Sequence, residues 1–275
     1  MTDILTTYIS KGGTGKTTIT VNLAALAASK GKRVLIVDLD TNGHVHTTLK
    51  FKEKQFKYFL QDWLMGRKEF NEVVMTDDSL KVDFLPANNN LNEVEVHLQM
   101  LRSSTRITPK IDYFLKEKID TIAHLYDVIF FDTHPTGVNN LVPMALLCSN
   151  KILMPVRIDE KDEKQLIESV VDVQGFVAAG YKMDYYVIPN AVDLRTMRRE
   201  YQYILNTLHD LNVENISNPI RYSTSISINS FKNAELTKVK SAGAKKVISD
   251  MESLYSLIFQ EVKTHDRERA SKQTT

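Results

Sequence analysis

The 275-residue chain is predicted to be an α/β protein with a mostly parallel, twisted sheet and helices on both faces. Short, continuous apolar runs alternate with segments in which apolar residues recur at helical spacing. Such runs are typical of strands that are covered on both faces of a parallel sheet. A glycine-rich turn follows the first run and leads into the clearest helical segment, which is the strand–turn–helix order of a phosphate-binding loop.

The apolar runs predict these strands in chain order: Leu5–Ser10, Val34–Asp40, Lys81–Pro86, Val128–Asp132, Ile152–Val156 and Tyr185–Pro189. The helical pattern is strongest over Gly15–Ser29, and weaker patterns cover Phe56–Gly66 and Leu91–Leu101. The polar stretches Asn88–Asn90 and Arg102–Pro109 are predicted to be loops.

Composition places the chain among globular proteins. Hydrophobic residues make up 43% and charged residues 25%, so the chain can bury a full core. We expect one domain over residues 1–262 and a polar, disordered tail over residues 263–275. No apolar run approaches the ~20 residues of a membrane span, and the first strand begins without a signal peptide, which predicts a cytoplasmic protein.

The glycine-rich turn, residues 10–18, reads SKGGTGKTT. A strict P-loop pattern has glycine where this chain has Ser10, but the Gly-Lys-Thr that follows and the strand–helix context both fit. Lys16 is expected to neutralise the β and γ phosphates, and Thr17 to offer its hydroxyl to Mg²⁺. Three glycines let backbone N–H groups surround the phosphate oxygens without side-chain bulk: Gly12, Gly13 and Gly15. The alternative is a glycine-rich turn ahead of an ordinary helix, but GKTT would rarely arise by chance at such a junction.

Acidic residues lie at the end of the predicted strand Val34–Asp40. Ligands of open α/β sheets bind outside the carboxyl ends of the strands, so Asp38 and Asp40 are expected near the phosphate site. The alternative is that both are solvated strand-end acids.

A second lysine, Lys11, precedes the glycines in the order KGG-T-GKTT. This motif resembles the deviant Walker A motif of the ParA/MinD family of ATPases. In that family the extra lysine reaches across a nucleotide-sandwich dimer, so the resemblance implies that Lys11 acts in trans, much as an arginine finger does. Taken alone, Lys11 could be a solvated loop lysine. The resemblance also implies ATP and Mg²⁺ as cofactors, with nucleotide contacts along the whole loop: Gly12, Gly13, Thr14, Gly15, Lys16, Thr17 and Thr18.

The resemblance implies roles for the strand-end acids. By similarity, Asp40 orients and polarises the attacking water, and Asp38 lies nearer the magnesium shell. Residues 126–135 read YDVIFFDTHP and resemble the family's Walker B segment. Asp132 in this segment is implied to hold Mg²⁺ through water, because Mg²⁺ keeps several waters and takes only one or two carboxylates.

The base of the nucleotide is expected further along the chain. Residues 185–193 read YYVIPNAVD, and the resemblance implies that Asn190 reads the adenine edge with its amide, which offers a donor and an acceptor. An asparagine in a strand-end turn is also common for local reasons. The resemblance places Pro219 near the nucleotide as well.

Two positions depart from the family pattern. Family members with a DNA role usually continue Asp-Pro-Gln-Gly, whereas Asp40 is followed by Thr41, Asn42 and Gly43. His134 stands where a first proline is common. A histidine beside phosphates suggests a catalytic role, but we favour a tolerated loop substitution.

Two branches of the family use hydrolysis differently, and the C-terminal sequence bears on the choice. The MinD branch ends in an amphipathic helix that binds membrane, which needs an apolar face beside a basic one. The final HDRERASKQTT has no apolar face, and Met251–Val262 is expected to pack on the sheet as the last core helix. We therefore expect no membrane binding.

The ParA branch binds DNA without sequence preference when dimerised by ATP, through basic residues in the C-terminal half. From Arg195 onward the chain carries 13 Lys and Arg against 9 Asp and Glu. Arg221 follows the nucleotide-proximal proline, where the family often has a DNA-contacting arginine, and it is the first candidate. The predicted DNA contacts are Arg195, Arg198, Arg199, Arg221, Lys245 and Lys246, with Lys232, Lys238 and Lys240 as further candidates.

These features together predict a DNA-partition ATPase similar to short, Soj-like ParA proteins, because the first strand begins too early for an N-terminal helix-turn-helix domain. As an ATP-bound homodimer it would coat nucleoid DNA in the cytoplasm, and a centromere-bound ParB-type adaptor would stimulate hydrolysis and release it. One alternative is a MinD-like, membrane-associated spatial regulator. Another is a metal- or cluster-handling ATPase, for which the single Cys148 offers too few ligands.

Overall fold

The structure is a computed structural model, and it describes residues 2–104, 112–134, 141–159, 163–222 and 242–259. Within these ranges eight strands form one sheet in the order β3-β4-β2-β5-β1-β6-β7-β8. β3 runs antiparallel to β4, and the other neighbouring pairs are parallel. The strands are β1 Asp3–Thr7, β2 Val34–Leu39, β3 Met75–Asp77, β4 Val82–Leu85, β5 Val128–Thr133, β6 Lys151–Arg157, β7 Asp184–Val192 and β8 Ile220–Arg221.

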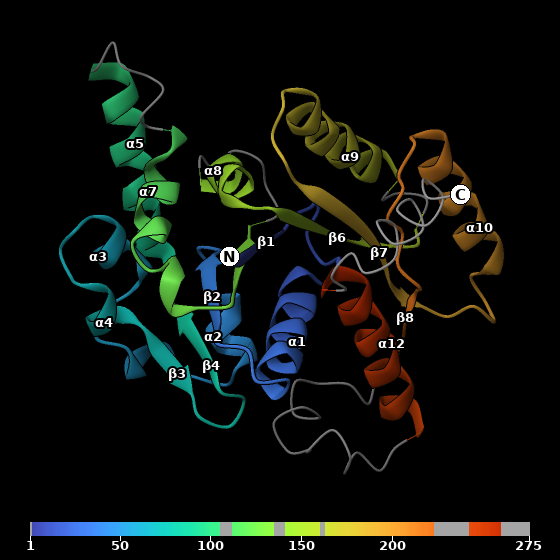
Figure 1. Cartoon of the computed structure of the whole chain (residues 1–275), viewed down its shortest axis with the longest axis horizontal. Coiled ribbons are helices and arrows are strands. Elements are labelled where there is room, and N and C mark those ends of the chain that lie inside the picture. The colour runs from blue at the N-terminus through green and yellow to red at the C-terminus, as the bar shows by residue number, and fades with distance from the viewer. Residues whose placement is uncertain (1, 105–111, 135–140, 160–162, 223–241, 260–275) are drawn as a thin grey trace, which may run out of the picture.

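Helices lie on both faces of the sheet (Figure 1). Their bounds are α1 Lys16–Ser29, α2 His44–Thr48, α3 Leu60–Leu64, α4 Phe70–Val73, α5 Asn92–Ser104, α7 Phe114–Asp120, α8 Leu141–Cys148, α9 Glu163–Ala178, α10 Arg198–Asp210 and α12 Ala242–Phe259. Short 3₁₀ turns occur at Glu53–Gln55, Asn89–Leu91 and Ala123–Leu125.

The continuous apolar strands are buried on both faces, as their sequences predict. On β2, Val34 and Ile36 belong to the cluster beneath α1 and α12, whereas Leu35 and Val37 belong to the cluster beneath α3, α5, α7 and α8. A third cluster joins β6 and β7 to α9 and α10. Because successive side chains of a strand point to opposite faces, each apolar residue of β2 finds a helical layer on its own side.

The strand order brings the candidate site to one edge of the sheet. In the sheet β5 lies between β1 and β2, and β6 lies on the other side of β1. The parallel strands β1, β2, β5, β6 and β7 therefore end at the same edge, where ligands of open α/β sheets bind. None of the helices in the described ranges combines the length and apolar character that a membrane span requires.

Most predicted elements are confirmed, with shifted ends. β1 ends at Thr7 rather than Ser10, because the backbone N–H of Ser10 has left the sheet and donates to the Ser169 hydroxyl at 3.1 Å. The predicted helix Phe56–Gly66 is wrong over its first turn, since only Leu60–Leu64 is helical. Aromatic packing holds the preceding residues instead, with Phe56 against Phe59 and Phe84.

Other predictions need correction at element ends. The loop predicted from Arg102 is helical up to Ser104, because α5 continues past Leu101. The predicted loop Asn88–Asn90 contains the start of a 3₁₀ turn, which the Asn88 side chain caps by accepting from the Asn90 N–H. The core helix expected from Met251 is confirmed within the described residues, but it begins earlier, as α12. The strands β3 and β8 were not predicted.

Candidate nucleotide-binding and active site

The phosphate-binding loop joins the end of β1 to the start of α1. Gly13 and Gly15 have φ angles of 76° and 98°, in the left-handed region that favours glycine. A Cβ atom on Gly15 would lie 2.2 Å from Nδ2 of Asn190. Asn190 lies near the carboxyl end of β7 and donates from Nδ2 to the carbonyl oxygen of Thr14 at 2.8 Å. Backbone conformation and packing thus both require glycine at position 15.

Lys16 is buried in the first turn of α1, and its ammonium group lies against the loop. Nζ donates to the carbonyl oxygens of Lys11, at 2.8 Å, and Ile9, at 3.3 Å. Burial lowers the pKa of Lys16 to about 8, although the charges of Asp132 and Asp40 act in the opposite direction. Lys11 is half-buried at the start of the same loop.

Two buried carboxylates lie on neighbouring strands below the loop. Asp38 on β2 is the cross-strand partner of Asp132 on β5, and both are fully buried. Thr17 donates from Oγ1 to Oδ2 of Asp132 at 2.6 Å, and Thr20 donates to Oδ1 at 3.3 Å. The structure therefore brings together the three residues that the sequence predicts as metal ligands: Thr17, Asp38 and Asp132.

The pKa values of Asp38 and Asp132 indicate whether a cation would be stable between them. Burial raises the pKa of Asp132 to about 6, against the hydrogen bond from Thr17, and the charge of Asp40 adds to the rise. Burial also raises the pKa of Asp38 well above its usual range, and the charge of Asp132 adds to it. A divalent cation would favour the ionised form of both groups. Carboxylate and hydroxyl oxygens are ligands that suit Mg²⁺, which takes its remaining ligands from water and phosphate, so these residues fit the ion.

Asp40 follows β2, and residues of the turn after it hold its carboxylate. Its Oδ1 accepts from the backbone N–H and from Nδ2 of Asn42, each at 2.9 Å. Its Oδ2 lies 2.9 Å from Nδ1 of His44, and Nε2 of His134 lies 3.9 Å from Oδ1. His134 thus lies next to the predicted water-orienting residue.

A cavity of about 290 Å³ lies between the phosphate-binding loop and Asp40. It is lined by the loop and by residues after β2 and β5: Gly12, Gly13, Gly15, Lys16, Thr17, Thr18, Asp40, His44 and Thr133. Its walls therefore carry the ammonium and backbone donors that bind phosphate and a carboxylate that can orient water.

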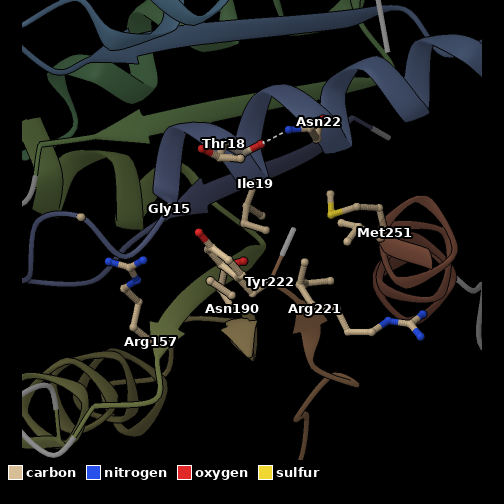
Figure 2. A pocket seen from close by; sticks show the side chains of 13 residues that line it. Gly15, Thr18, Ile19, Asn22, Arg157, Asn190, Arg221, Tyr222 and Met251 are labelled. Atoms are coloured by element: carbon tan, nitrogen blue, oxygen red, sulfur yellow. Dashed lines mark hydrogen bonds between the residues drawn. The ribbon is translucent and has the colours of Figure 1, made fainter. Parts of the chain in front are cut away.

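A second cavity, of about 260 Å³, adjoins the first through shared loop residues (Figure 2). Ile19, Val247 and Met251 form its apolar wall, from α1 and α12, and Asn190 lies opposite. A mainly apolar pocket with a few polar groups is typical of a site for a flat heterocyclic base.

Several residues that line this second cavity were not predicted from the sequence, among them Arg157, Ile220 and Tyr222. Arg157 extends from the end of β6 toward the phosphate-binding loop (Figure 2). Ile220, on the short strand β8, lines the cavity in place of its predicted neighbour Pro219, which is half-buried outside it. In the sequence, Arg157 directly follows a buried apolar strand, and such strands end at the ligand-binding edge of the sheet. This position could have indicated that Arg157 lies at the site.

The predicted DNA contacts are partly brought together. A hollow of about 360 Å³ between the end of β7, β8 and α12 is lined by Arg195, Arg221 and Lys246, and it shares Arg221, Tyr222 and Val247 with the second cavity. Arg195 is 88% exposed and paired with Asp193 at 2.7 Å. Lys245 is exposed on α12 beside Lys246.

The remaining candidates lie elsewhere. Arg198 and Arg199 are exposed on the first turn of α10, and Arg199 lines a separate hollow together with Asp159 and Glu200. The further candidates lie outside the described residues: Lys232, Lys238 and Lys240.

Arg221 is held more firmly than a solvated surface arginine. Its Nε and Nη2 donate to the two oxygens of Asp250, at 2.9 and 2.6 Å, and Nη2 also donates to the carbonyl oxygen of Lys246 at 2.8 Å. The side chain is still 42% exposed. The bidentate pair ties β8 to α12 and leaves part of the guanidinium facing solvent.

The mostly parallel sheet has a glycine-rich turn between β1 and α1, a buried Lys16, a half-buried Thr17 and acidic residues at the ends of neighbouring strands. These features define a P-loop nucleotide-binding protein. A family profile described as an AAA domain matches residues 2–177, more than half of the chain. The cell division protein PomZ of Myxococcus xanthus is 30% identical over 150 residues, which cover 54% of this chain and 44% of PomZ. The sporulation initiation inhibitor protein Soj of Bacillus subtilis is 29% identical over 153 residues, covering 54% of this chain and 56% of Soj.

The chain belongs to the ParA/Soj-like family of deviant Walker A ATPases, which confirms the resemblance that the KGGTGKTT motif predicts. An ATP complex of a McdA variant from Cyanothece has the same fold, with a TM-score of 0.78 and 16% identity over 94% of this chain and 96% of that chain. The chain spans about half the length of the curated relatives it matches.

Proposed function

We propose that the protein is a Mg²⁺-dependent ATPase that partitions DNA or positions a comparable cargo by cycling between nucleotide states. The observation that carries this proposal is one cavity that is lined by the glycines of the phosphate-binding loop and by Lys16, Thr17 and Asp40. The base-sized pocket beside it supports a nucleoside triphosphate as the ligand. The name of another relative, the chromosome partitioning protein ParA of Caulobacter vibrioides, supports the partition of DNA.

The phosphates would bind across the loop, with Lys16 and the N-terminus of α1 carrying their charge. Thr17, Asp38 and Asp132 are the residues that would hold Mg²⁺. When bound, the ion neutralises charge on the β and γ phosphates. Asp40 would orient a water molecule, whose oxygen adds to the γ phosphorus as the bond to ADP breaks, giving ADP and phosphate.

The base and ribose would lie in the second cavity, against Ile19 and Met251. Asn190 is the proposed reader of the adenine edge, with Ile220 rather than Pro219 at the wall. Arg157 is an additional candidate, because it extends a guanidinium group toward the loop from the end of β6.

Residues 1–262 would act as one ATPase domain that dimerises with ATP. Lys11 begins the loop and would reach the partner's phosphates, adding positive charge at the transition state. Its half-buried position beside the Lys16 ammonium supports a role at the phosphates.

The ATP-bound dimer would bind DNA without sequence preference through the basic hollow. Arg195, Arg221 and Lys246 line this hollow, and Lys245 lies beside it. Arg221, Tyr222 and Val247 also line the nucleotide cavity, so nucleotide binding can alter the DNA-binding surface directly. Arg198 and Arg199 would extend the surface onto α10.

In the cell the dimer would coat the nucleoid in the cytoplasm, and a centromere-binding, ParB-type adaptor would complete the geometry around Asp40 and trigger release. A membrane-associated role of the MinD type is the competing function. Co-sedimentation with liposomes of mixed zwitterionic and anionic lipids distinguishes the two.

The proposal is tested by measuring Mg²⁺-dependent ATP turnover and molecular mass in ATP for the wild type and three variants. Lys16→Ala should lose nucleotide binding, Lys11→Ala should bind ATP but remain monomeric, and Asp40→Ala should accumulate as an ATP-bound dimer. The exposed Lys32→Ala serves as the matched lysine control and should behave as the wild type. Wild-type turnover in the Asp40 variant would remove the catalytic assignment of that residue.

A further inference from the structure

The carboxylate of Asp40 is held on both oxygens by residues of the turn that follows it. Only 3% of its side chain is exposed, whereas 54% of the His44 side chain is exposed. Asn42 donates twice to Oδ1, from its backbone and from its side chain, each at 2.9 Å. His44 lies on the other side, with Nδ1 2.9 Å from Oδ2.

These contacts leave the two oxygens of Asp40 unequal. An ionised carboxylate has about four acceptor sites, two on each oxygen, and Asn42 occupies both sites on Oδ1. Since the carboxylate can only accept, Nδ1 of His44 is assigned as the protonated nitrogen, and it fills one site on Oδ2. The hydrogen bonds among the described residues therefore leave one acceptor site on Oδ2, beside the imidazole ring.

Asp40 and His44 both lie in the wall of the phosphate cavity. Asp40 and His44 line this cavity together with Lys16 and Thr17, so a water bound at Oδ2 would lie between the imidazole and the phosphate-binding groups. Because His44 Nδ1 fills one acceptor site of Oδ2, a water can use only the other site, so His44 determines from which direction the water is held.

A glycine in the turn makes this arrangement possible. The N–H of Gly43 donates to the carbonyl oxygen of Asp40 at 2.9 Å, and its φ of 64° lies in the left-handed region. A Cβ atom at Gly43 would lie 2.7 Å from the carbonyl oxygen of Ala87 and 2.2 Å from the His46 ring. The turn therefore packs tightly and starts α2 at His44, one helical turn after Asp40.

We propose that His44 is a positioning residue for hydrolysis, which fixes the Asp40 carboxylate so that Oδ2 alone holds the attacking water. This inference rests on the proposed role of Asp40. It explains why the segment after Asp40 can depart from the family pattern: Asn42 and His44 supply the hydrogen bonds that orient the carboxylate.

The test compares kcat, KM and ATP affinity for His44→Ala, His44→Asn and the wild type. His44→Ala should lower kcat by about 10- to 100-fold and leave ATP affinity unchanged, because a misdirected water affects the transition state alone. His44→Asn should restore kcat to within about threefold, because the asparagine Nδ2 can take the place of Nδ1 as donor. The exposed His209→Ala, at the end of α10, is the matched histidine control.

A double variant separates this inference from the proposed function. In the Asp40→Ala background, His44→Ala should cause no further loss of kcat, because its only role is to hold Asp40. An unchanged kcat in His44→Ala, failure of His44→Asn to restore it, or an additive loss in the double variant would each overturn the inference. Full turnover in Asp40→Ala alone would instead overturn the proposed role of Asp40.

Discussion

Asp38 and Asp132 face each other as cross-strand partners on the parallel strands β2 and β5, and both side chains are fully buried. Thr17 reaches Asp132 from the first turn of α1 at 2.6 Å. Two buried carboxylates on neighbouring strands repel each other unless a proton or a cation lies nearby. The pair therefore lowers the stability of the metal-free fold and favours cation binding.

Asp132→Asn should make the metal-free protein more stable at neutral pH and nearly abolish ATP turnover. The folded-state pKa of about 6 lies above the ordinary 3.8, so the folded state holds the proton more tightly. Wild-type stability therefore falls as pH rises from about 4 to 7, and the variant should lose the part of this fall that Asp132 contributes, whereas the buried Asp38 keeps its own part. Urea denaturation in a chelating buffer measures the difference, which we expect to be about 1 to 3 kcal/mol at pH 7. A variant less stable than the wild type at pH 7 would contradict the argument.

When ATP binds near pH 8, the protein should take up about half a proton per molecule, at Lys16. The pKa of Lys16 is lowered to about 8 by burial, so about half of the unliganded protein carries a neutral amine at that pH. The phosphates favour the charged form, so ATP affinity should fall by up to about tenfold per pH unit above pH 8. Titration calorimetry at pH 8 in buffers of different ionisation enthalpy measures the uptake. Identical heats in all buffers would contradict it.

Gly15→Ala should destabilise the protein by about 1 to 3 kcal/mol, because a side chain must adopt the left-handed conformation there. The new Cβ would also lie 2.2 Å from Nδ2 of Asn190 and would displace that residue from the loop. Gly175→Ala is the matched control, since Gly175 lies within α9, where a Cβ would meet nothing within 4 Å. The control should be neutral or stabilising by up to about 1 kcal/mol. Chemical denaturation of both variants checks the contrast.

Arg157→Gln should weaken ATP binding by about tenfold and adenosine binding by less than twofold, because a guanidinium group that extends toward the loop acts on phosphate. Arg157→Lys should restore part of the affinity, since it keeps the charge but loses the planar fork. Fluorescence-detected titration with ATP, ADP and adenosine gives the comparison. Equal losses for ATP and adenosine would assign Arg157 to the base or ribose instead.

The sequence predicts those parts of the site that depend on local pattern. The loop residues Gly13 to Thr17 are recognised because strand, turn and helix are contiguous in the chain. Asp38, Asp40 and Asp132 follow continuous apolar runs, and parallel strands place their carboxyl ends together. These features need no knowledge of how distant helices pack.

Features that depend on tertiary contacts were not predicted. The strand β8 has two residues and pairs with β7 through a shifted register, so its sequence carries no strand pattern, and Ile220 was missed in favour of Pro219. The role of His44 depends on a tight turn that begins at Asp40. The ion pair of Arg221 joins residues 29 positions apart, and no local pattern predicts it.

The most direct test of the proposed function is binding to random-sequence duplex DNA with ATP, ADP and no nucleotide, at two salt concentrations. We predict that the wild type binds DNA with ATP but not with ADP or without nucleotide, and that higher salt weakens this binding. Arg221→Ala should bind DNA several-fold more weakly than the wild type. Arg33→Ala is the matched control, because Arg33 forms a similar bidentate pair with Asp127 next to the opposite end of β2. DNA binding that is equal in all nucleotide states, or no DNA binding in any state, would contradict the proposal of an ATP-controlled DNA-partition protein.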